Sequence, residues 1–390
     1  MKIALVYDPV YPYVIGGAEK RYRDFAVALA KKGHDVYLVG MKYWQGEDLK
    51  MEDGIKLAGI CKAVPLYNKS GARSVFEAVY FGWHVFVHLL RNSYDVVDCC
   101  SFPYFSAIAC RLAVLFRGRG ACGKLVITWL EIWGKAYWRK YSGALWFVGH
   151  LLEKIASKLT VNNIAISRFT AFRMAAELGV PENSITVVPC GIDCDFLRAK
   201  SSADKENQLV YVGRVIEHKR VDMLIEAFGE LVAQKSFPAD IKLRIVGSGP
   251  AEENCRKLTR RLGLGESVEF AGFLKENDLF EEIAASLVFI LPSEREGLGI
   301  SVVESMALGT PVIARNAEYS AVKEIINSGV NGILFNDKNG LKDALVKLLT
   351  DKALYARLTD EGYKTASAYD LISKTAPKLE EYYRNAKAVR

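Results

Sequence analysis

The sequence predicts an α/β protein built from two doubly wound domains, each with a mainly parallel sheet. Short apolar strands alternate with amphipathic helices in both halves of the chain, which is the pattern of repeated βαβ units. A polar stretch at residues 199–207 lies between the halves and is typical of a linker. In such a protein we expect the two Rossmann-like domains to face a central cleft, with ligands at the carboxyl ends of the strands.

The first half opens with a predicted strand at residues 3–7 and a helix at 18–32. Tyr22, Phe25, Ala26 and Leu29 give that helix apolar positions at i, i+3, i+4 and i+7. Further strands are predicted at residues 35–39, 96–99, 125–128, 163–166 and 185–188. The loop after the first strand lacks the Gly-x-Gly-x-x-Gly pattern, which argues against a dinucleotide-dependent dehydrogenase.

The second half repeats the alternation after the linker. Strands are predicted at residues 209–212, 241–246, 268–270 and 286–291, and helices at 220–235, 251–262 and from about Ser301. The predicted domains are therefore residues 1–198 and 207–370. The length of 390 residues suits two domains of ordinary size.

Composition narrows the classes of function. The eight cysteines form no Cys-x-x-Cys pair and the five histidines show no ligand spacing, so we expect reduced thiols and neither a metal nor another cofactor. The chain begins with a strand-like segment and has no apolar run of membrane-spanning length, which favours a cytoplasmic protein. A net charge of +7 suits anionic ligands or an anionic membrane surface. No motif indicates nucleic acid as a partner.

The most informative stretch holds two carboxylates, Glu296 and Glu304, on either side of Gly297-Leu298-Gly299. It follows an apolar strand and leads into a helix, whose exposed first N–H groups suit an anionic ligand. A carboxylate one turn into the helix can accept hydrogen bonds from hydroxyls. Phosphate together with polyol is the chemistry of a sugar nucleotide. The alternative is that Ser301-x-x-Glu304 is only a capping box.

Three other strand ends in the second half carry ligand-type signals. The first runs into Gly213-Arg214 and then Lys219, a pair of cations beside a predicted helix start, as a diphosphate requires. A solvated basic turn is the alternative. Gly247 and Gly249 follow the second strand, and Gly272-Phe273-Leu274 the third. These glycines would allow a ligand to approach the backbone closely. The alternative is that they are present only because the turns require them.

The ordered set of motifs resembles the family-4 (group 1) glycosyltransferases of the GT-B fold over nearly the whole chain. The segments that carry the resemblance are Gly16-Gly17-Ala18-Glu19, Pro189-Cys190-Gly191-Ile192-Asp193, Val212-Gly213-Arg214 with Lys219, Val246-Gly247-Ser248-Gly249-Pro250, Ala271-Gly272-Phe273, Pro292-Ser293 with Glu296 and Glu304-Ser305-Met306-Ala307, and Glu318 with Glu324-Ile325-Ile326 and Asn331-Gly332.

The resemblance implies retaining, metal-independent transfer of a hexosyl group from a nucleoside-diphosphate sugar to a glycan, lipid-linked or small-molecule acceptor. Arg214 and Lys219 would hold the diphosphate, and Glu304 the ribose hydroxyls. Glu296 and the backbone of residues 297–299 would contact the donor sugar. The remaining implied donor-site residues are Gly16, Gly17, Gly247, Phe273 and Leu274. The final helix, about residues 371–390, would return to the first domain.

The chain departs from the family at Leu130. Relatives commonly carry a histidine before an acidic residue there, whereas this sequence has Leu130 followed by Glu131. A leucine side chain makes no hydrogen bond, so Glu131 is expected to take part of the missing role, and we count it with Glu296, Arg214 and Lys219 as a candidate catalytic residue. The alternatives are a non-catalytic nucleotide-sugar-binding subunit and a nucleotide-sugar epimerase of the same fold.

Two aromatic-rich segments, residues 75–90 and 128–150, indicate what kind of acceptor the chain uses. The second interleaves its aromatic residues with Lys135, Arg139 and Lys140. About half of these aromatic side chains should belong to the core. An aromatic and basic surface also suits contact with an anionic membrane. The sequence therefore predicts peripheral association with the inner face of a membrane, with a soluble acceptor as the alternative.

Overall fold

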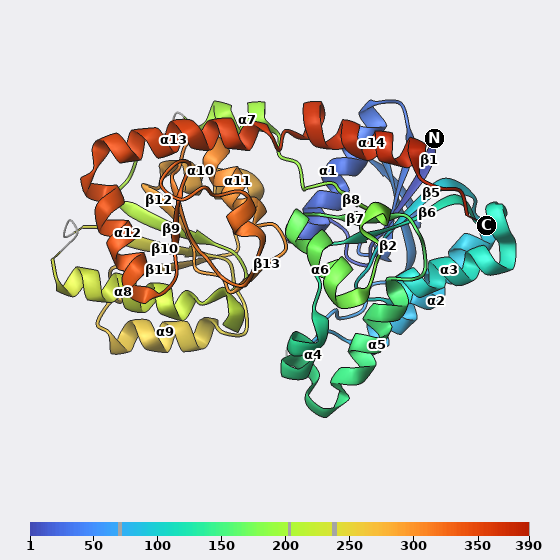
Figure 1. The fold of residues 1–390 in the computed structure, drawn as a ribbon, viewed down its shortest axis with the longest axis horizontal. Coiled ribbons are helices and arrows are strands. Elements are labelled where there is room, and N and C mark those ends of the chain that lie inside the picture. Colours follow the sequence, from blue (N-terminus) through green and yellow to red (C-terminus); the bar gives the residue numbers. More distant parts are fainter. Residues whose placement is uncertain (69–71, 202–203, 236–239, 390) are drawn as a thin grey trace. The chain divides into compact units, whose positions relative to one another are not determined.

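A computed structural model describes all residues except 69–71, 202–203, 236–239 and 390, and the chain separates into two compact units (Figure 1). The first unit is Met1–Gly191 together with Leu371–Arg390, and the second is Ile192–Asp370. The sequence predicts that the first domain ends at residue 198. In the structure α7 (Cys194–Lys200) belongs to the second unit, because it packs against two of that unit's helices, α10 (Glu276–Ala285) and α11 (Ile300–Ala307).

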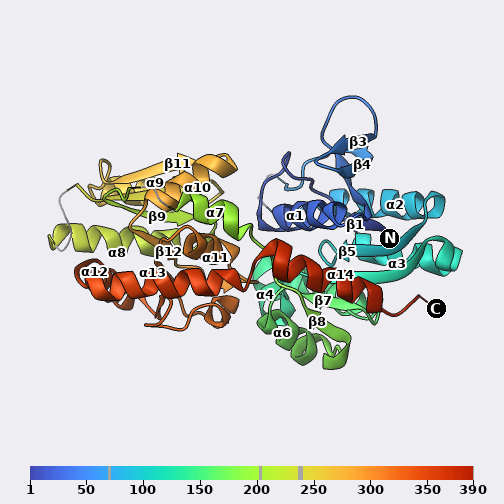
Figure 2. The ribbon, with the colours of Figure 1, turned by 90° about the horizontal axis from the view of Figure 1, so that it is seen from above.

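The first unit contains an eight-stranded sheet in the order β3-β4-β2-β1-β5-β6-β7-β8. All neighbouring strands are parallel except β3 and β4, which form an antiparallel hairpin at one edge (Figure 2). The sequence analysis did not predict this hairpin. The strands are β1 (Lys2–Val6), β2 (Asp35–Lys42), β3 (Leu49–Glu52), β4 (Ile55–Lys62), β5 (Tyr94–Cys100), β6 (Cys122–Trp129), β7 (Asn163–Ala165) and β8 (Ile185–Val187).

Helices cover both faces of this sheet and bury one core on each side. One core takes residues from α2 (Val75–Arg91), α3 (Phe105–Arg117), α4 (Gly134–Ser142), α5 (Trp146–Ala156) and α6 (Arg168–Leu178). The other takes residues from α1 (Gly17–Lys31), the π-helical turn Leu371–Thr375 and α14 (Ala376–Asn385). α1 and α14 contact each other, which places the end of the chain on the first unit.

The second unit has a six-stranded, fully parallel sheet in the order β11-β10-β9-β12-β14-β16. In chain order this is 3-2-1-4-5-6, the arrangement of the dinucleotide-binding fold. The strands are β9 (Gln208–Val212), β10 (Lys242–Val246), β11 (Val268–Gly272), β12 (Val288–Leu291), β14 (Val312–Arg315) and β16 (Ile333–Phe335). β12 is buried at all four positions, since a central parallel strand is covered on both faces.

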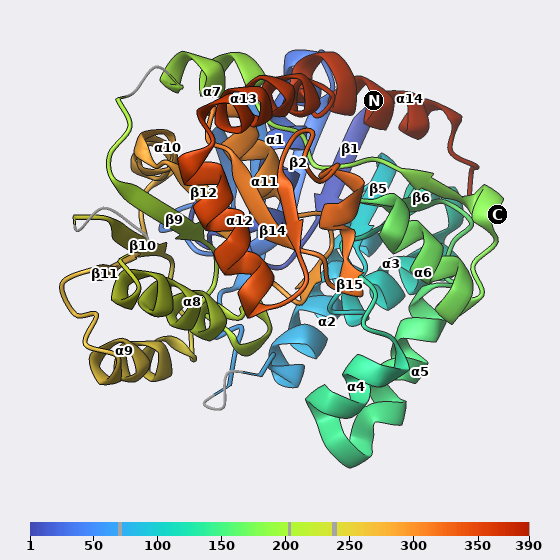
Figure 3. The ribbon, with the colours of Figure 1, turned by 60° about the vertical axis from the view of Figure 1, so that its left-hand side comes forward.

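Two helical layers enclose this second sheet (Figure 3). On one side α8 (Val221–Ala233) contacts both α9 (Glu252–Arg261) and α12 (Lys338–Thr350). On the other side α11 contacts α7 and α13 (Lys352–Ser367). A separate two-stranded ladder joins β13 (Arg295–Glu296) to β15 (Tyr319–Ser320). This ladder contains Glu296, the first of the two predicted carboxylates.

All eight cysteines are free thiols, and every one except Cys194 is buried. Burial raises the pKa of the Cys61 and Cys122 thiols to about 12, so these thiols stay protonated and behave as small apolar side chains. Within the described part of the chain, none of the helices combines the length and apolar character needed to cross a lipid bilayer.

Candidate active site

The strand order of the second unit creates a topological switch point between β9 and β12. These strands are parallel neighbours, with Val288 beside Leu209 and Phe289 beside Val210. The chain leaves β9 toward α8 and leaves β12 toward α11. The two connections diverge at the carboxyl ends of these strands, and this is the position where ligands of this fold class bind. The Arg214–Lys219 segment and the Glu296–Glu304 segment are these two connections.

The loop after β9 is fixed by the loop after β10. Gly213 donates a backbone hydrogen bond to Val246 at 3.0 Å, and Val215 donates one to Ser248 at 3.0 Å. A Cβ atom on Gly247 would lie 2.0 Å from the Gly213 carbonyl oxygen, and Gly247 has a φ of +123°. The glycine at 247 is thus explained by this close contact between loops. Its predicted contact with the donor stays a prediction.

The loop after β12 ends in a left-handed glycine that starts α11. Gly299 has a φ of +87° and is the N-cap, without a side-chain capping bond, and the helix begins at Ile300. Ser301 lies inside the helix, so the capping-box alternative for Ser301 and Glu304 is wrong. Glu304 sits one turn into the helix and is only 6% exposed.

Three contacts tie the two loops together across the switch point. The Lys219 ammonium donates to the Glu296 carboxylate at 2.5 Å. The Glu294 backbone N–H donates to the His218 carbonyl at 2.8 Å, and the Arg220 guanidinium donates to the Glu294 carboxylate at 2.8 Å. Two residues predicted separately for diphosphate and sugar contact, Lys219 and Glu296, are therefore neighbours.

The loop that follows β9 has a positive electrostatic environment, which lowers the pKa of His218. Burial lowers the pKa of the His218 imidazole, and the nearby charges of Lys219, Arg295 and Arg214 lower it further, to about 3. Glu294 opposes this shift without cancelling it. The same field that disfavours a protonated imidazole favours a bound anion. Binding of a diphosphate at this loop stays a prediction.

Sequence reasoning missed three charged residues of this region. The Glu294 carboxylate accepts hydrogen bonds from Arg220 and, at 3.1 Å, from Arg315 at the end of β14. Burial raises the pKa of Glu294, but the two guanidinium groups outweigh this and lower it overall. Arg315 meets Glu294 because β14 is a neighbour of β12 in the sheet, so no local pattern in the sequence indicated it. Arg220 and Glu294 likewise had no signal in the sequence.

Phe273 and Leu274 directly follow β11, whose last residue is in contact with the site loops. The Gly272 carbonyl accepts a hydrogen bond from Gly247 at 2.6 Å, so the ends of β9, β10 and β11 lie side by side. The Phe273 ring is 57% exposed. A large exposed aromatic side chain beside a ligand crevice is available for stacking on a flat ring.

Gly16 and Gly17 belong to the first unit and form the start of α1. Gly16 is its N-cap in an extended conformation, and Gly17 is the first helical residue. A Cβ atom on Gly16 would lie 2.5 Å from the Glu19 carboxylate, which folds back over the helix start. The absence of a side chain at Gly16 therefore serves this local packing. Closure of both glycines on donor phosphates stays a prediction.

Leu130 and Glu131 follow β6 in the first unit, at the carboxyl end of its sheet. Leu130 is half-buried against the core that contains α1 and α14. The Glu131 carboxylate accepts a hydrogen bond from the Trp133 indole N–H at 2.7 Å. The Trp133 ring in turn stacks on Phe102 with the ring centres 4.8 Å apart. Glu131 is thus held by a side chain only two residues away.

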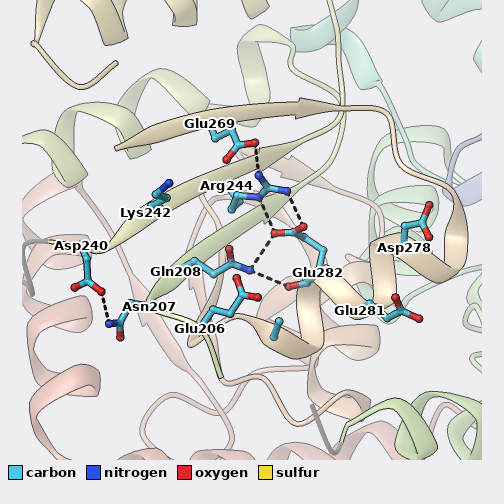
Figure 4. Close-up of a pocket in the computed structure, with 11 residues that line it drawn as sticks. Glu206, Asn207, Gln208, Asp240, Lys242, Arg244, Glu269, Asp278, Glu281 and Glu282 are labelled. Carbon is cyan, nitrogen blue, oxygen red and sulfur yellow. Dashed lines mark hydrogen bonds and ion pairs between the residues drawn. The ribbon is translucent and has the colours of Figure 1, made fainter. Parts of the chain in front are cut away.

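A cavity of about 580 Å³ lies in the second unit away from these residues (Figure 4). It is lined by Gln208 and Lys242, the first residues of β9 and β10, so it opens at the amino end of the sheet. Six carboxylates and only two cations line it: Glu206, Asp240, Glu269, Asp278, Glu281 and Glu282 against Lys242 and Arg244. Both its position and its charge are wrong for a nucleoside diphosphate.

No group of three or more His, Cys, Asp or Glu side chains within the described ranges could hold a metal ion.

Two family models together match nearly all residues of the chain. The model described as Glycosyltransferase Family 4 matches residues 15–196, and the model described as Glycosyl transferases group 1 matches residues 194–365. The two matches meet at the boundary between the structural units.

Individual proteins agree with these matches. An uncharacterized glycosyltransferase of Methanocaldococcus jannaschii is 24% identical over 376 residues, which cover 87% of this chain and 86% of that protein. A GDP-mannose-dependent alpha-(1-6)-phosphatidylinositol monomannoside mannosyltransferase of Mycobacterium tuberculosis is 28% identical over 244 residues, or 58% and 62% of the two chains. The structure of Anabaena HepE in complex with UDP and glucose superposes with a TM-score of 0.75 at 19% identity, covering 99% and 100%.

The chain belongs to the group 1 glycosyltransferases and has the GT-B fold. It is an enzyme that transfers sugar from a nucleotide sugar. The β9–β12 switch point is therefore the candidate donor site.

Glu304→Gln is expected to weaken donor binding by at least about tenfold while leaving the melting temperature nearly unchanged. A hydrogen bond to a charged group contributes about 1.5–3 kcal/mol, whereas Gly299 rather than Glu304 and Ser301 caps the helix. Calorimetric titration with nucleoside diphosphates and a thermal melt measure the two quantities. A large loss of stability with unchanged affinity would assign Glu304 to the helix and not to the ligand.

Proposed function

We propose that the chain is a retaining, metal-independent hexosyltransferase that uses a nucleoside-diphosphate sugar. The observation that carries the proposal is the cationic switch point, where Lys219 and Glu296 from two separate loops meet at 2.5 Å. Arg214 and Lys219 supply positive charge for the departing diphosphate, which is the role that a metal ion has in other transferases. Glu296 and the backbone of residues 297–299 serve the donor sugar.

The transfer step breaks the bond between the anomeric carbon and the diphosphate oxygen, and the electron pair leaves with the nucleoside diphosphate. The acceptor hydroxyl oxygen forms the new bond to the anomeric carbon from the same face. Its proton passes to the leaving phosphate oxygen, so that no enzymic nucleophile is required. The transition state resembles an oxocarbenium ion, as in glycoside hydrolysis, and the cations of the loop after β9 stabilise the developing negative charge.

The names of the similar proteins narrow the substrates that should be tested first. HepE was solved with UDP and glucose, and the mycobacterial relative is described as GDP-mannose-dependent and acts on a phosphatidylinositol monomannoside. Both nucleotides are therefore primary candidates for the donor. The mycobacterial example also supports a lipid-linked acceptor, presented at a membrane surface.

Leu130 supports one second candidate, a subunit that binds a nucleotide sugar without transferring it. Its side chain is half-buried in the core and offers no hydrogen bond at the position where the family commonly has a histidine. A nucleotide-sugar epimerase of the same fold is a third candidate, and it would consume donor without acceptor.

One experiment separates these candidates. A thermal-shift panel of UDP-, GDP- and ADP-sugars identifies the donor, and incubation of that donor with lipid-linked and glycan acceptors follows, with and without a chelator. We expect a product whose anomeric configuration by NMR matches the donor, formed equally with the chelator present. Binding without product would favour the non-catalytic subunit, and isomerised donor without acceptor would favour the epimerase. An inverted product would contradict retention.

A further inference from the structure

Four helices on one face of the first unit's sheet expose large apolar side chains. α2, α3, α4 and α5 bury their inner sides in the same core. Their outer sides leave Phe76, Trp83, Phe116, Phe147 and Leu151 between 53% and 76% exposed. Single exposed apolar residues are ordinary, but a set repeated along neighbouring helices marks an interaction surface.

Direct contacts connect these helices to one another. The Phe86 ring of α2 meets the Phe116 ring of α3 with the centres 5.7 Å apart. The backbone N–H of Arg73, just before α2, donates to the Tyr141 hydroxyl of α4 at 2.8 Å. The Trp138 ring of α4 occupies the space over Gly149 of α5. We call the exposed side of α2, α3, α4 and α5 the apolar–cationic face.

The charges on this face all have one sign. The four helices contain only two acidic residues, Glu77 and Glu153, and both are 0% exposed. Glu153 is directed inward, where it accepts hydrogen bonds from the backbone N–H groups of Trp133 and Gly134. Six of the seven lysine and arginine side chains of the same helices are exposed: Arg91, Arg117, Lys135, Arg139, Lys140 and Lys154.

Two of these cations are held beside an aromatic ring of the face. The guanidinium carbon of Arg139 lies 4.7 Å from the centre of the Trp146 ring, and the Lys135 ammonium lies 5.3 Å from it. Positive charge therefore borders the apolar side chains of α5. An apolar surface with a basic border is the pattern that binds the headgroup region of anionic bilayers.

The positive charge of this face distinguishes among three possible partners: a second copy of the chain, nucleic acid and an anionic lipid surface. A second copy of this chain, meeting the first through the same face, would place like charges against each other with no exposed carboxylate from these helices to pair them. Nucleic acid would match the charge but not the aliphatic side chains such as Leu151 and Leu115, which are 56% and 62% exposed. An anionic lipid surface matches both properties.

We propose that the apolar–cationic face docks on an anionic lipid bilayer, with the side chains of α2, α3 and α5 in the headgroup region and the cations of α4 and α5 against lipid phosphates. Docking would bring the chain to the surface that carries a lipid-linked acceptor. Only this link to the acceptor rests on the proposed function. The docking itself is independent of the donor site in the second unit.

The test uses sedimentation of the full chain with vesicles of phosphatidylcholine alone and with about one-third phosphatidylglycerol. We expect binding to the anionic vesicles only. Each cation near such a surface contributes about fivefold to partitioning, so Lys135→Glu with Arg139→Glu and Lys140→Glu should weaken binding at least about a hundredfold. Phe76→Ser with Trp83→Ser, and separately Phe147→Ser with Leu151→Ser, should each weaken it at least about tenfold.

Matched controls use exposed residues elsewhere in the chain. Met51→Ser removes an apolar side chain that is 61% exposed on β3, and Lys257→Glu with Arg260→Glu reverses two exposed cations on α9. Both should bind vesicles as the unaltered chain does. Thermal melts and nucleoside-diphosphate titration of every variant show that folding and the donor site are intact, so that loss of docking is distinguished from failure of the transferase assignment.

Three outcomes would overturn the proposal: no sedimentation with either vesicle, binding that the face variants leave unchanged, or a dimer in analytical ultracentrifugation that those variants dissociate. The last result would assign the face to a second copy of the chain.

Discussion

Lys219→Ala and Arg214→Ala are each expected to weaken binding of a nucleoside diphosphate by about 10- to 150-fold. Each substitution removes a charge-assisted contact, which contributes about 1.5–3 kcal/mol. Lys219→Ala should have the larger effect, because it also leaves the Glu296 carboxylate, held at 2.5 Å by the ammonium, without that cation in a mostly buried position. Calorimetric titration with UDP and GDP measures both effects.

A double variant separates the two contributions at Lys219. If part of the loss comes from repulsion between Glu296 and the diphosphate, Lys219→Ala with Glu296→Gln should bind more tightly than Lys219→Ala alone. Lys242→Ala is the matched control, because this cation lies at the amino end of the same sheet. Unchanged affinity in both single variants would remove Lys219 and Arg214 from the donor site.

Glu131→Ala is expected to lower the rate of transfer by at least about tenfold, the effect of losing one hydrogen bond to a charged group. The prediction follows from the half-buried Leu130, which makes no hydrogen bond and leaves Glu131 as the nearest charged side chain after β6. Transfer and donor hydrolysis are compared in the unaltered chain, Glu131→Ala and Leu130→His. Activity that arises only in Leu130→His would show that the natural chain binds donor without transferring it.

The Glu131 experiment has a structural control. Glu131 accepts a hydrogen bond from the Trp133 indole, so its loss could act by releasing that ring. Trp133→Phe removes the same hydrogen bond and keeps both the carboxylate and an aromatic ring to stack on Phe102. A transfer rate reduced in Glu131→Ala but kept in Trp133→Phe would assign the effect to the carboxylate. Equal losses would make Glu131 a positioning residue for Trp133.

Local patterns in the sequence were enough for the fold class and for most elements around the donor site. β9, β10 and β12 are short apolar runs and the helices between them have a 3.6-residue period, so both signals lie within one element. The edge hairpin of β3 and β4 was missed because β3 has only four residues and its two apolar side chains, Leu49 and Met51, are exposed and join no core. The motif around Glu296 and Glu304 was likewise visible as a local pattern.

Tertiary structure decided what the motif residues contact. Lys219 and Glu296 are 77 residues apart in the chain, and only the adjacency of β9 and β12 brings them together. The same reason explains why Arg315 was not predicted. The start of α11 also became known only from the structure: Gly299 has a left-handed conformation and is the N-cap, so Ser301 lies inside the helix.

The aromatic segments show the same division between sequence and structure. Composition identified residues 75–90 and 128–150 as aromatic and basic, but it did not separate core from surface. In the structure Trp129 and Trp138 are buried, whereas Trp83 and Phe147 are exposed. The sequence by itself determined the types of side chain and their order. Which of them meet was decided by the order of strands in the sheets, because that order alone fixes which distant segments become neighbours.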